Sequence, residues 1–402
     1  MQTNLPTMQP VNKYFLATIV LMLIPLSGLA IDIYVPSLPA VSRYFGVDKA
    51  LVQLSITVYM AGMGLTQLFA GSISDSFGRK NPLIISMTIF IIITFCLPFS
   101  ENIYQLLFFR FIQGVSLAVS VVPLRSVIAD LFEGREFKKM MNFMTTAWSI
   151  GPIIAPAIGG YLEYYFGWKA SFYFLGIYSI AVFTLALIYL PETSLHRHPF
   201  KLKSIVDRYI QILSHYKFAS GVLIDGLLYS IMIIFSIVGP FLIQTVLHYS
   251  AIQFGHIALS LGFAWFLGTL TNHWLIDIPL QLKAKICLWS ICIILLAMLG
   301  LAAIFPVNIY NLVIGMGMLA WIGGIIFPNY FSRSVSLFPT TTGSANALFG
   351  SFVFFIAGIS SGFGTLLKST SDAPMIIAYI VLILLCLALF YFERMHKSTS
   401  IN

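Results

Sequence analysis

A single carboxylate, Asp32, stands in a long apolar stretch that runs from Tyr14 to Leu38. About 25 residues of helix rise roughly 37 Å, enough to cross the ~30 Å core of a bilayer. An ionised Asp near the bilayer centre is costly, so such residues usually face a bundle interior and take part in ion or proton chemistry. Pro36 and Pro39 leave a second interpretation open, in which the helix ends early and Asp32 is hydrated near the outer surface.

Two further charges lie in apolar stretches. Arg110 stays protonated in a membrane and needs a carboxylate, a carbonyl group or water. Asp32 is its expected carboxylate partner, and an arginine held by carbonyl groups alone is the alternative. Asp225 lies about eight residues into a later stretch. It is either a second coupling or cation-binding acid or a residue near the inner surface, and its position favours the surface.

The composition defines the class of protein. The chain has 402 residues, of which 59% are hydrophobic and 9% are charged, whereas soluble domains carry about 25% charged residues. We therefore expect an all-α integral membrane protein with twelve transmembrane helices in two six-helix halves. The apolar stretches lie near 14–37, 51–72, 82–99, 105–130, 140–162, 169–190, 218–246, 252–272, 286–305, 310–331, 344–366 and 374–392.

The basic residues predict the orientation of these helices. If both termini are cytoplasmic, all but six of the 22 Lys and Arg residues fall in the inner connections or the tails. The exceptions are Arg43, Lys49, Lys169 and Lys368 on the outer side, and Arg110 and Arg125 inside the fourth stretch. This asymmetry fits the positive-inside rule. The net charge of +8 therefore indicates orientation and does not predict nucleic-acid binding.

The longest inner connection, 191–217, separates an N-terminal half (1–190) from a C-terminal half (218–402). Its apolar residues recur at helical spacing, with charged residues on the other face. This pattern predicts an amphipathic helix on the inner membrane surface. Two halves of six helices are typical of transporters whose site lies between the halves near the bilayer midplane.

A second pattern of small residues lies in the fifth stretch. Gly151, Ala155 and Gly159 recur every four residues and give a face for close helix contact. Pro152 and Pro156 bend the helix, and Gly160 extends the small face. Ordinary close packing of membrane helices explains the same pattern.

The first inner connection holds Gly71, Asp75, Gly78 and Arg79. The glycines permit tight packing and a turn, Asp75 can neutralise nearby helix ends, and Arg79 can reach a facing carboxylate. The segment 71–80 resembles the signature between helices 2 and 3 of the major facilitator superfamily. In that family this loop is a gating latch and not a substrate site.

Other segments strengthen the resemblance. Residues 110–114 are similar to the superfamily's fourth-helix motif, whose arginine is tied to proton coupling. Residues 151–160 resemble the antiporter motif of drug:proton exporters, a hinge between the halves. Four more segments resemble the Bcr/CflA branch of drug:proton antiporters: 32–39, 125–132, 327–329 and 343–350. Ser76, Ala129 and Asp225 depart from the family pattern.

The resemblance implies proton-coupled export of small amphipathic organic compounds by alternating access. Asp32 and Arg110 would couple transport to protons, and an aromatic, apolar cavity would bind the substrate. Candidate cavity residues are Tyr34, Gln113, Met144, Trp148, Phe235 and Asn346. We expect a monomer in the bacterial inner membrane whose partners are protons, the substrate and lipid. We expect no cofactor, no metal and no nucleic acid.

A dedicated metabolite or siderophore carrier, in either direction of transport, is the main alternative. Asp225 and Arg125 facing the cavity would support it. An enzyme is not expected, because the seven histidines are scattered and form no His-Glu-x-x-His motif. ATP-driven transport is disfavoured because no Gly-x-x-x-x-Gly-Lys-Ser/Thr segment occurs.

Overall fold

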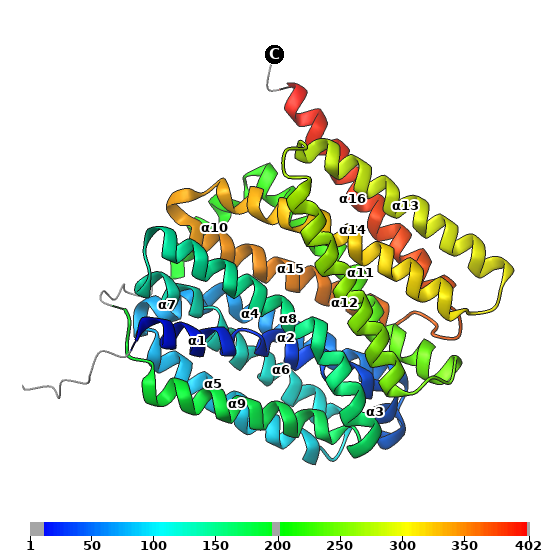
Figure 1. Ribbon diagram of the computed structural model, residues 1–402, viewed down its shortest axis with the longest axis horizontal. Helices are drawn as coiled ribbons and strands as arrows, with labels where there is room; N and C mark the ends of the chain where they lie inside the picture. The colour runs from blue at the N-terminus through cyan, green and yellow to red at the C-terminus, as the bar shows by residue number, and fades with distance from the viewer. Residues whose placement is uncertain (1–11, 195–201, 400–402) are drawn as a thin grey trace, which may run out of the picture.

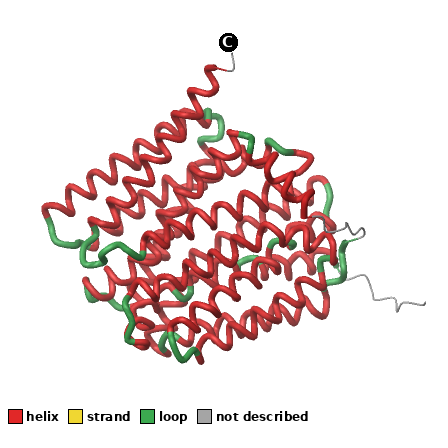
Figure 2. Tube along the Cα trace, turned by 180° about the vertical axis from the view of Figure 1, so that it is seen from behind, coloured by secondary structure: helices red, strands yellow, loops and turns green. Residues whose placement is uncertain are grey.

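The computed structural model describes residues 12–194 and 202–399, which form a bundle of long helices with no strand among them (Figures 1 and 2). A shorter helix, α10 (Leu202–Leu213), connects the two halves of the chain. We call the end of the bundle at which α10 lies the linker end, and the opposite end the far end. Short loops join the long helices at both ends.

The helices follow one another without long interruptions. The first half contains α1 (Lys13–Leu23), α2 (Leu26–Asp32), η1 (Val35–Ser37), α3 (Leu38–Phe45), α4 (Lys49–Phe77), α5 (Lys80–Cys96), η2 (Leu97–Phe99), α6 (Ile103–Val121), α7 (Leu124–Leu131), α8 (Gly134–Phe166) and α9 (Lys169–Tyr189). The second half contains α11 (Tyr216–Phe241), the π-helical turn η3 (Leu242–Val246), α12 (Ala251–Trp274), α13 (Leu280–Ile304), α14 (Ile309–Ser336), η4 (Pro339–Thr341), α15 (Thr342–Gly364) and α16 (Ala373–Thr399).

These helices confirm the all-α membrane fold. In the described part of the chain, 11 helical segments are long and apolar enough to cross a membrane. Helix α8, with 33 residues, covers the remaining predicted stretch, 140–162. The first half of α8 carries the polar residues Asn142, Thr145, Thr146 and Ser149, so this part of the helix is less apolar than a typical membrane-spanning segment. The predicted division into halves lies close to the end of α9 and the start of α11.

The first predicted span is a broken helix and not a continuous one. Helix α1 ends at Leu23, next to Pro25, and α2 ends at Asp32. Proline lacks an N–H group, so Pro25 and Pro36 interrupt the ladder of backbone hydrogen bonds. The chain nevertheless continues through η1 and α3 to Phe45 within one apolar segment. Asp32 therefore lies at a helix end deep inside the bundle.

Small residues bring the two halves together along two helix pairs, α4 with α15 and α8 with α12. Ser351 Oγ donates to the Gly64 carbonyl at 2.5 Å, and the hydroxyls of Thr57 and Ser361 share a hydrogen bond at 2.8 Å. On the other pair, Gly160 packs directly on the backbone of α12. Such residues permit close backbone approach where no large side chain intervenes.

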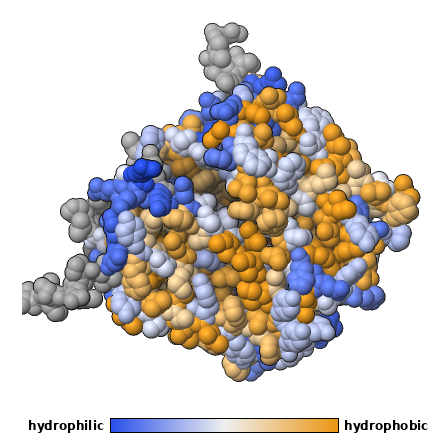
Figure 3. All heavy atoms as spheres, in the orientation of Figure 1, coloured by the Kyte–Doolittle hydropathy of each residue, from blue (hydrophilic) through white to orange (hydrophobic). Residues whose placement is uncertain are grey.

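The outer surface is strongly apolar, as lipid-facing helices require. Large hydrophobic side chains are exposed on most long helices, and Figure 3 shows them over much of one face. On the linker helix α10, the apolar side chains of Leu202, Val206 and Ile210 are exposed. Tyr209 Oη donates to the Leu68 carbonyl of α4, and Arg208 Nη1 donates to Ser344 Oγ of α15. The linker therefore touches both halves.

Candidate functional site

Arg110 on α6 is completely buried in the first half. Its Nη1 donates to the Ala30 carbonyl at 2.9 Å and to Gln113 Oε1 at 2.6 Å, and its Nε donates to the Ser55 carbonyl at 3.4 Å. Gln113 in turn donates to Thr94 Oγ1 at 2.8 Å. One arginine thus connects α2, α4 and α6.

Two tyrosine rings enclose the same guanidinium. Its carbon lies 4.5 Å from the ring centre of Tyr59 and 5.1 Å from that of Tyr34, within the range of cation–π attraction. The predicted ion pair between Arg110 and Asp32 is absent from the described residues. Backbone and amide oxygens accept from Nη1 and Nε of Arg110, whereas its Nη2 is buried without a hydrogen-bond partner. This arrangement is closer to the alternative of an arginine held by carbonyl groups than to an ion pair. Arg110 fixes the backbone of α2 two residues before Asp32.

Asp32 itself is half-buried, whereas both of its neighbours along the chain are buried. Its charge acts on the hydroxyl groups of Tyr59 on α4 and Tyr229 on α11. Tyr59 belongs to the first half and Tyr229 to the second, and four residues after Asp32 the Pro36 carbonyl accepts from Gln244 of the second half, so the Asp32 segment runs along the interface of the halves. The interpretation of Asp32 as an interior residue fits this position better than one at the outer surface.

Aromatic side chains of the second half continue from Tyr229. Its ring lies 6.4 Å from that of Phe327 and 6.2 Å from that of Phe354, and Phe327 lies 5.7 Å from Trp265. This aromatic group was not predicted. Only the helix packing brings its members, from α11, α12, α14 and α15, into one place.

The predicted cavity residues are found in two kinds of environment. Tyr34 and Gln113 are completely buried around Arg110, and Met144 is buried. Phe235 is buried and stacks with Phe254 at 6.3 Å. Trp148 and Asn346 are half-buried, and the amide oxygen of Asn346 has no hydrogen-bond partner. Of the predicted set, Trp148 and Asn346 are therefore the residues best placed to meet a ligand.

The glycines and prolines of α8 pack on the segment that carries Asp32. A methyl group added at Gly151 would lie 2.9 Å from the Pro25 carbonyl oxygen, and Gly159 packs directly on Ile33. From the other side, Pro152 lies against Gly28. Because Gly160 contacts α12, the predicted hinge touches both the Asp32 segment and the second half. The small residues serve packing, as both interpretations of the pattern require.

The segment 71–80 forms a polar network at the linker end. Helix α4 extends to Phe77, so Asp75 lies in its last turn, and a tight turn at Gly78 follows. Arg79 pairs with Asp75 and reaches Asp130 at the end of α7, with Nε 3.4 Å from Oδ2. Gly71 faces open space and has no close neighbour.

A residue that was not predicted completes this network. Glu192 accepts from the backbone N–H groups of Arg79 at 2.8 Å and Lys80 at 3.2 Å. Thr193 Oγ1 donates to Asp130 at 2.8 Å. The only sequence signal for this contact is a carboxylate just after the sixth apolar stretch. The network therefore joins the first half to the start of the connection 191–217.

Hydrogen bonds close the interface between the halves at the far end. Gln53 Nε2 donates to the Ile237 carbonyl at 2.7 Å, and Gln244 Nε2 donates to the Pro36 carbonyl at 2.9 Å. Tyr161 and His256 share a further bond at 3.0 Å. This bond joins His256 of α12 to Tyr161 of α8.

Asp225 is completely buried within the second half, one helical turn before Tyr229. Whether it lies near the inner membrane surface, as its place in the sequence favours, stays a prediction. The helices around it, α14 and α16, come from distant parts of the chain, and their packing could not be read from the local sequence.

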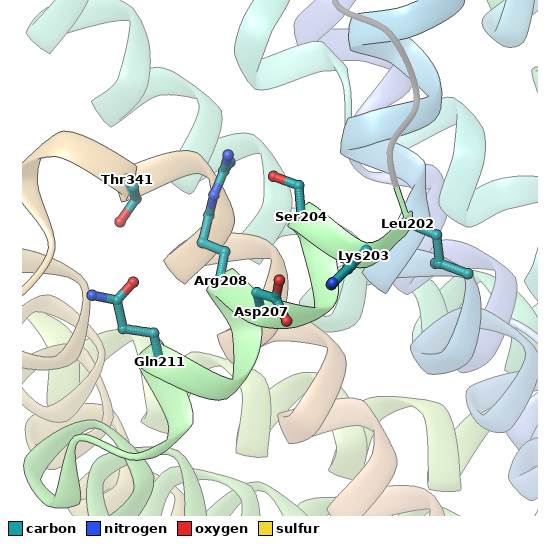
Figure 4. Close-up of a pocket in the computed structure, with 7 residues that line it drawn as sticks. All are labelled: Leu202, Lys203, Ser204, Asp207, Arg208, Gln211 and Thr341. Atoms are coloured by element: carbon teal, nitrogen blue, oxygen red, sulfur yellow. The ribbon is translucent and has the colours of Figure 1, made fainter.

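A surface pocket lies elsewhere, on the linker. It measures about 660 Å³ and is lined by Leu202, Lys203, Ser204, Asp207, Arg208, Gln211 and Thr341 (Figure 4). None of these residues belongs to the Asp32 region. The described residues contain no group of three His, Cys, Asp or Glu side chains arranged to hold a metal ion.

Two helical halves around a polar centre in an apolar bundle define a membrane transporter. Residues 20–362 match the Major Facilitator Superfamily, and the chain belongs to this family. It is therefore a transporter and not an enzyme.

Among similar proteins, the bicyclomycin resistance protein homolog of Haemophilus influenzae is 25% identical over 93% of this chain and 94% of its own length. Multidrug resistance protein D of Escherichia coli is 24% identical over 90% and 91%. Multidrug resistance protein MdtL of a Shewanella species is 26% identical over 84% and 85%. These relatives fit the Bcr/CflA branch.

Solved structures show the same fold. A D-xylose–proton symporter superposes with a TM-score of 0.74 at 14% identity, over 93% of this chain and 97% of its own. The human organic anion transporter MFSD10 gives 0.67 at 16% identity, over 94% and 99%.

Proposed function

We propose that this protein exports small amphipathic organic compounds in exchange for protons, by alternating access, with Asp32 as the coupling acid. The observation that supports the proposal is the half-buried carboxyl group of Asp32, at a helix end from which its charge reaches Tyr59 of its own half and Tyr229 of the opposite half. The relatives named for drug resistance support the substrate class. We further propose that the linker end faces the cytoplasm of a bacterial inner membrane, with both termini on that side.

Proton and substrate compete for one polar centre in this mechanism. When the far end is open, Asp32 takes a proton from outside. When the linker end is open, Asp32 releases the proton, and the free carboxylate with the aromatic group around Tyr229 favours an amphipathic substrate. Each charge moved across 100 mV releases about 2.3 kcal/mol, enough for roughly fifty-fold accumulation per proton. Arg110 holds the backbone of α2 in place and acts as a positioning residue.

The helix contacts indicate how the halves move. The bonds made by Gln53, Gln244 and Tyr161 hold the far end closed, and they must break for the opposite state. Helix α8 contacts both α2 and α12 through glycines, so movement of the second half is transmitted to the segment carrying Asp32.

The test is transport by the purified protein in proteoliposomes with an imposed pH gradient, screened with amphipathic compounds. We compare wild type with Asp32→Asn, which keeps the shape of the side chain but cannot release a proton. Asp372→Asn is the matched control, because Asp372 is a buried carboxylate at the far end that accepts from Asn311 Nδ2 at 3.1 Å. Gradient-driven transport should vanish only with Asp32→Asn. Unchanged transport in that variant would rule Asp32 out as the coupling acid.

A dedicated carrier for an anionic metabolite remains the second candidate. One observation favours it: the side chain of Arg125 is exposed and could bind an anion. The other condition fails, because Asp225 is sealed inside the second half. If Arg125→Gln abolishes transport of anions while cationic and neutral amphipathic compounds are not transported by wild type, this second function replaces the first.

A further inference from the structure

A second group of charges lies inside the C-terminal half, and the mechanism above does not use it. Asp225 on α11 has no exposed surface. Arg333 on α14 forms an ion pair with Glu393 on α16 and donates through Nη2 to the Lys217 carbonyl at 3.0 Å. Ser220 donates to Glu393 Oε2 at 3.0 Å. An ion pair and hydrogen bonds thus connect α11, α14 and α16 at their linker ends.

Two members of this group, Asp225 and Arg333, have polar atoms without hydrogen-bond partners. Neither carboxyl oxygen of Asp225 has a hydrogen-bond partner, and Nε of Arg333 has none either. The charge of Arg333 and the backbone of Phe331 act on Asp225, but no hydrogen bond of full geometry reaches either carboxyl oxygen. A sealed carboxyl group so poorly supplied with donors is far more costly when ionised than when protonated. Asp225 therefore carries a proton in this conformation.

Between the Arg333–Glu393 pair and the linker end lies a small cavity that Asp225 itself does not line. This cavity of about 20 Å³, large enough for one water molecule, is lined by Leu280, Gln281, Tyr330, Arg333, Phe390, Glu393 and Arg394. The side chains of Arg333 and Glu393 are 22% and 14% exposed, so the pair lies between Asp225 and the aqueous surface. Tyr330, in the same cavity wall, interacts electrostatically with both Asp225 and Glu393.

The surroundings of Asp225 contain few other titratable groups. From α14 they are Tyr330 and Arg333, and from α16 Cys386 and Glu393. Helix α15 carries no ionisable residue. Helix α10 meets α11 at its first turn, near Phe218. On α11 itself, Tyr229 follows Asp225 by one helical turn, and the charge of Asp32 in the N-terminal half acts on Tyr229. Toward the far end the N-terminal half meets α11 through Gln53 at Ile237 and meets η3 through Pro36 at Gln244.

We propose that Asp225 is a second proton-binding site, which exchanges its proton with the cytoplasm through the Arg333–Glu393 pair rather than through the cavity between the halves. When Asp225 loses its proton, the free Nε of Arg333 is the donor placed to turn toward it. Arg333 then divides its charge between Glu393 and Asp225, and the contact between α11, α14 and α16 changes. This proposal rests on the proposed function, since it adds a second proton to the same transport cycle.

The first test reads the proton directly and needs no substrate. Infrared difference spectra of the purified protein, recorded between neutral and alkaline pH, report the carbonyl stretch of protonated carboxyl groups. Asp225→Asn should remove one such band at neutral pH, Asp225→Glu should shift it, and Asp372→Asn should leave it unchanged. An identical spectrum in Asp225→Asn would overturn the proposal. If Asp225→Asn does not fold, the shift in Asp225→Glu decides in its place.

The second test counts protons in proteoliposomes, from the membrane potential and pH gradient at which net flux of a transported dye stops. Asp225→Asn should still transport but move one proton fewer per substrate, whereas Asp32→Asn should lose gradient-driven transport altogether. An unchanged ratio in Asp225→Asn overturns the second site and leaves the proposed function intact. If transport by the wild-type protein does not depend on the pH gradient, the proposed function is overturned. The infrared measurement still reports on the proton of Asp225 in that case.

Discussion

The two halves each bury an aspartate and an arginine, but in opposite arrangements. In the first half the acid, Asp32, is half-buried at the interface and the arginine, Arg110, is completely sealed. In the second half the acid, Asp225, is sealed and the arginine, Arg333, is 22% exposed at its side chain. The acid that opens toward the interface can compete with a substrate, and the sealed acid can exchange only a proton. The exposure of each aspartate to the interface therefore indicates different roles for Asp32 and Asp225.

The arginines provide the strongest test of this comparison. Arg110→Gln leaves the Ala30 and Ser55 carbonyls without their donor in a sealed site, where each unsatisfied group costs about 1–3 kcal/mol. We expect a large loss of thermal stability and no transport. Arg333→Gln leaves Glu393 in reach of water and should destabilise less. Thermal unfolding in detergent checks both variants, and an equal or larger loss in Arg333→Gln would contradict the contrast.

Substitution of a glycine of α8 tests whether transport needs close packing of α8 on the Asp32 segment. In Gly159→Ala the new methyl group would lie 2.8 Å from the Ile33 carbonyl carbon, so α8 must move away from the Asp32 segment at a cost of about 1–3 kcal/mol. Transport should fall with stability. Gly71→Ala is the control, because nothing lies within 4 Å of the added group. Equal transport in the two variants would show that contact between α8 and this segment is not needed.

The polar network at the linker end of the first half gives a smaller effect. Gly78 has a φ of 90° and packs against the Glu192 carboxylate, whose carbon would lie 2.8 Å from a new methyl group. Gly78→Ala should cost about 1–2 kcal/mol in backbone strain and also displace Glu192. Gly46→Ala shares only the strain, with a φ of 63° and nothing within 4 Å. Unfolding midpoints should therefore fall further for Gly78→Ala, and the reverse order would count against the role of Glu192.

The smallest effect on transport and stability is expected for an exposed ion pair. Lys13 Nζ lies 2.6 Å from Glu136 Oε2, between α1 and α8, with both side chains about half exposed. Solvent and salt screen such pairs, and their contribution is small. Glu136→Gln should leave transport rate and unfolding midpoint unchanged within measurement error. A clear loss would mean that the pair fixes the contact between α1 and α8 after all.

Much of the fold was predictable because the signals are long. Apolar stretches of spanning length and an asymmetry of basic residues extend over the whole chain. Helix ends were less predictable: α4 runs to Phe77, and the first span breaks at Asp32. Proline positions hinted at that break, but whether a proline ends a helix or only interrupts it depends on the surrounding helices.

The site was predicted by residue type and corrected by geometry. Asp32, Arg110 and the small residues of α8 were found from the sequence because charges and repeated glycines are rare signals in apolar helices. The rotation of each helix about its axis carries no such signal. Phe235 and Gln113 were therefore assigned to the cavity although they are buried, and Tyr229, Phe327 and Glu192 were missed.

The sequence by itself determined that this protein is a two-part bundle of membrane helices with an acid and an arginine in its apolar interior, because the cost of charge in a bilayer makes those residues conspicuous. Only the tertiary structure decided which partners they have. It gave Arg110 carbonyl groups in place of Asp32, brought the charge of Asp32 within range of Tyr229 of the other half, and buried Asp225 completely within range of Arg333. Partners are set by helix rotation and by contacts between residues far apart in the chain, and neither leaves a local pattern in the sequence.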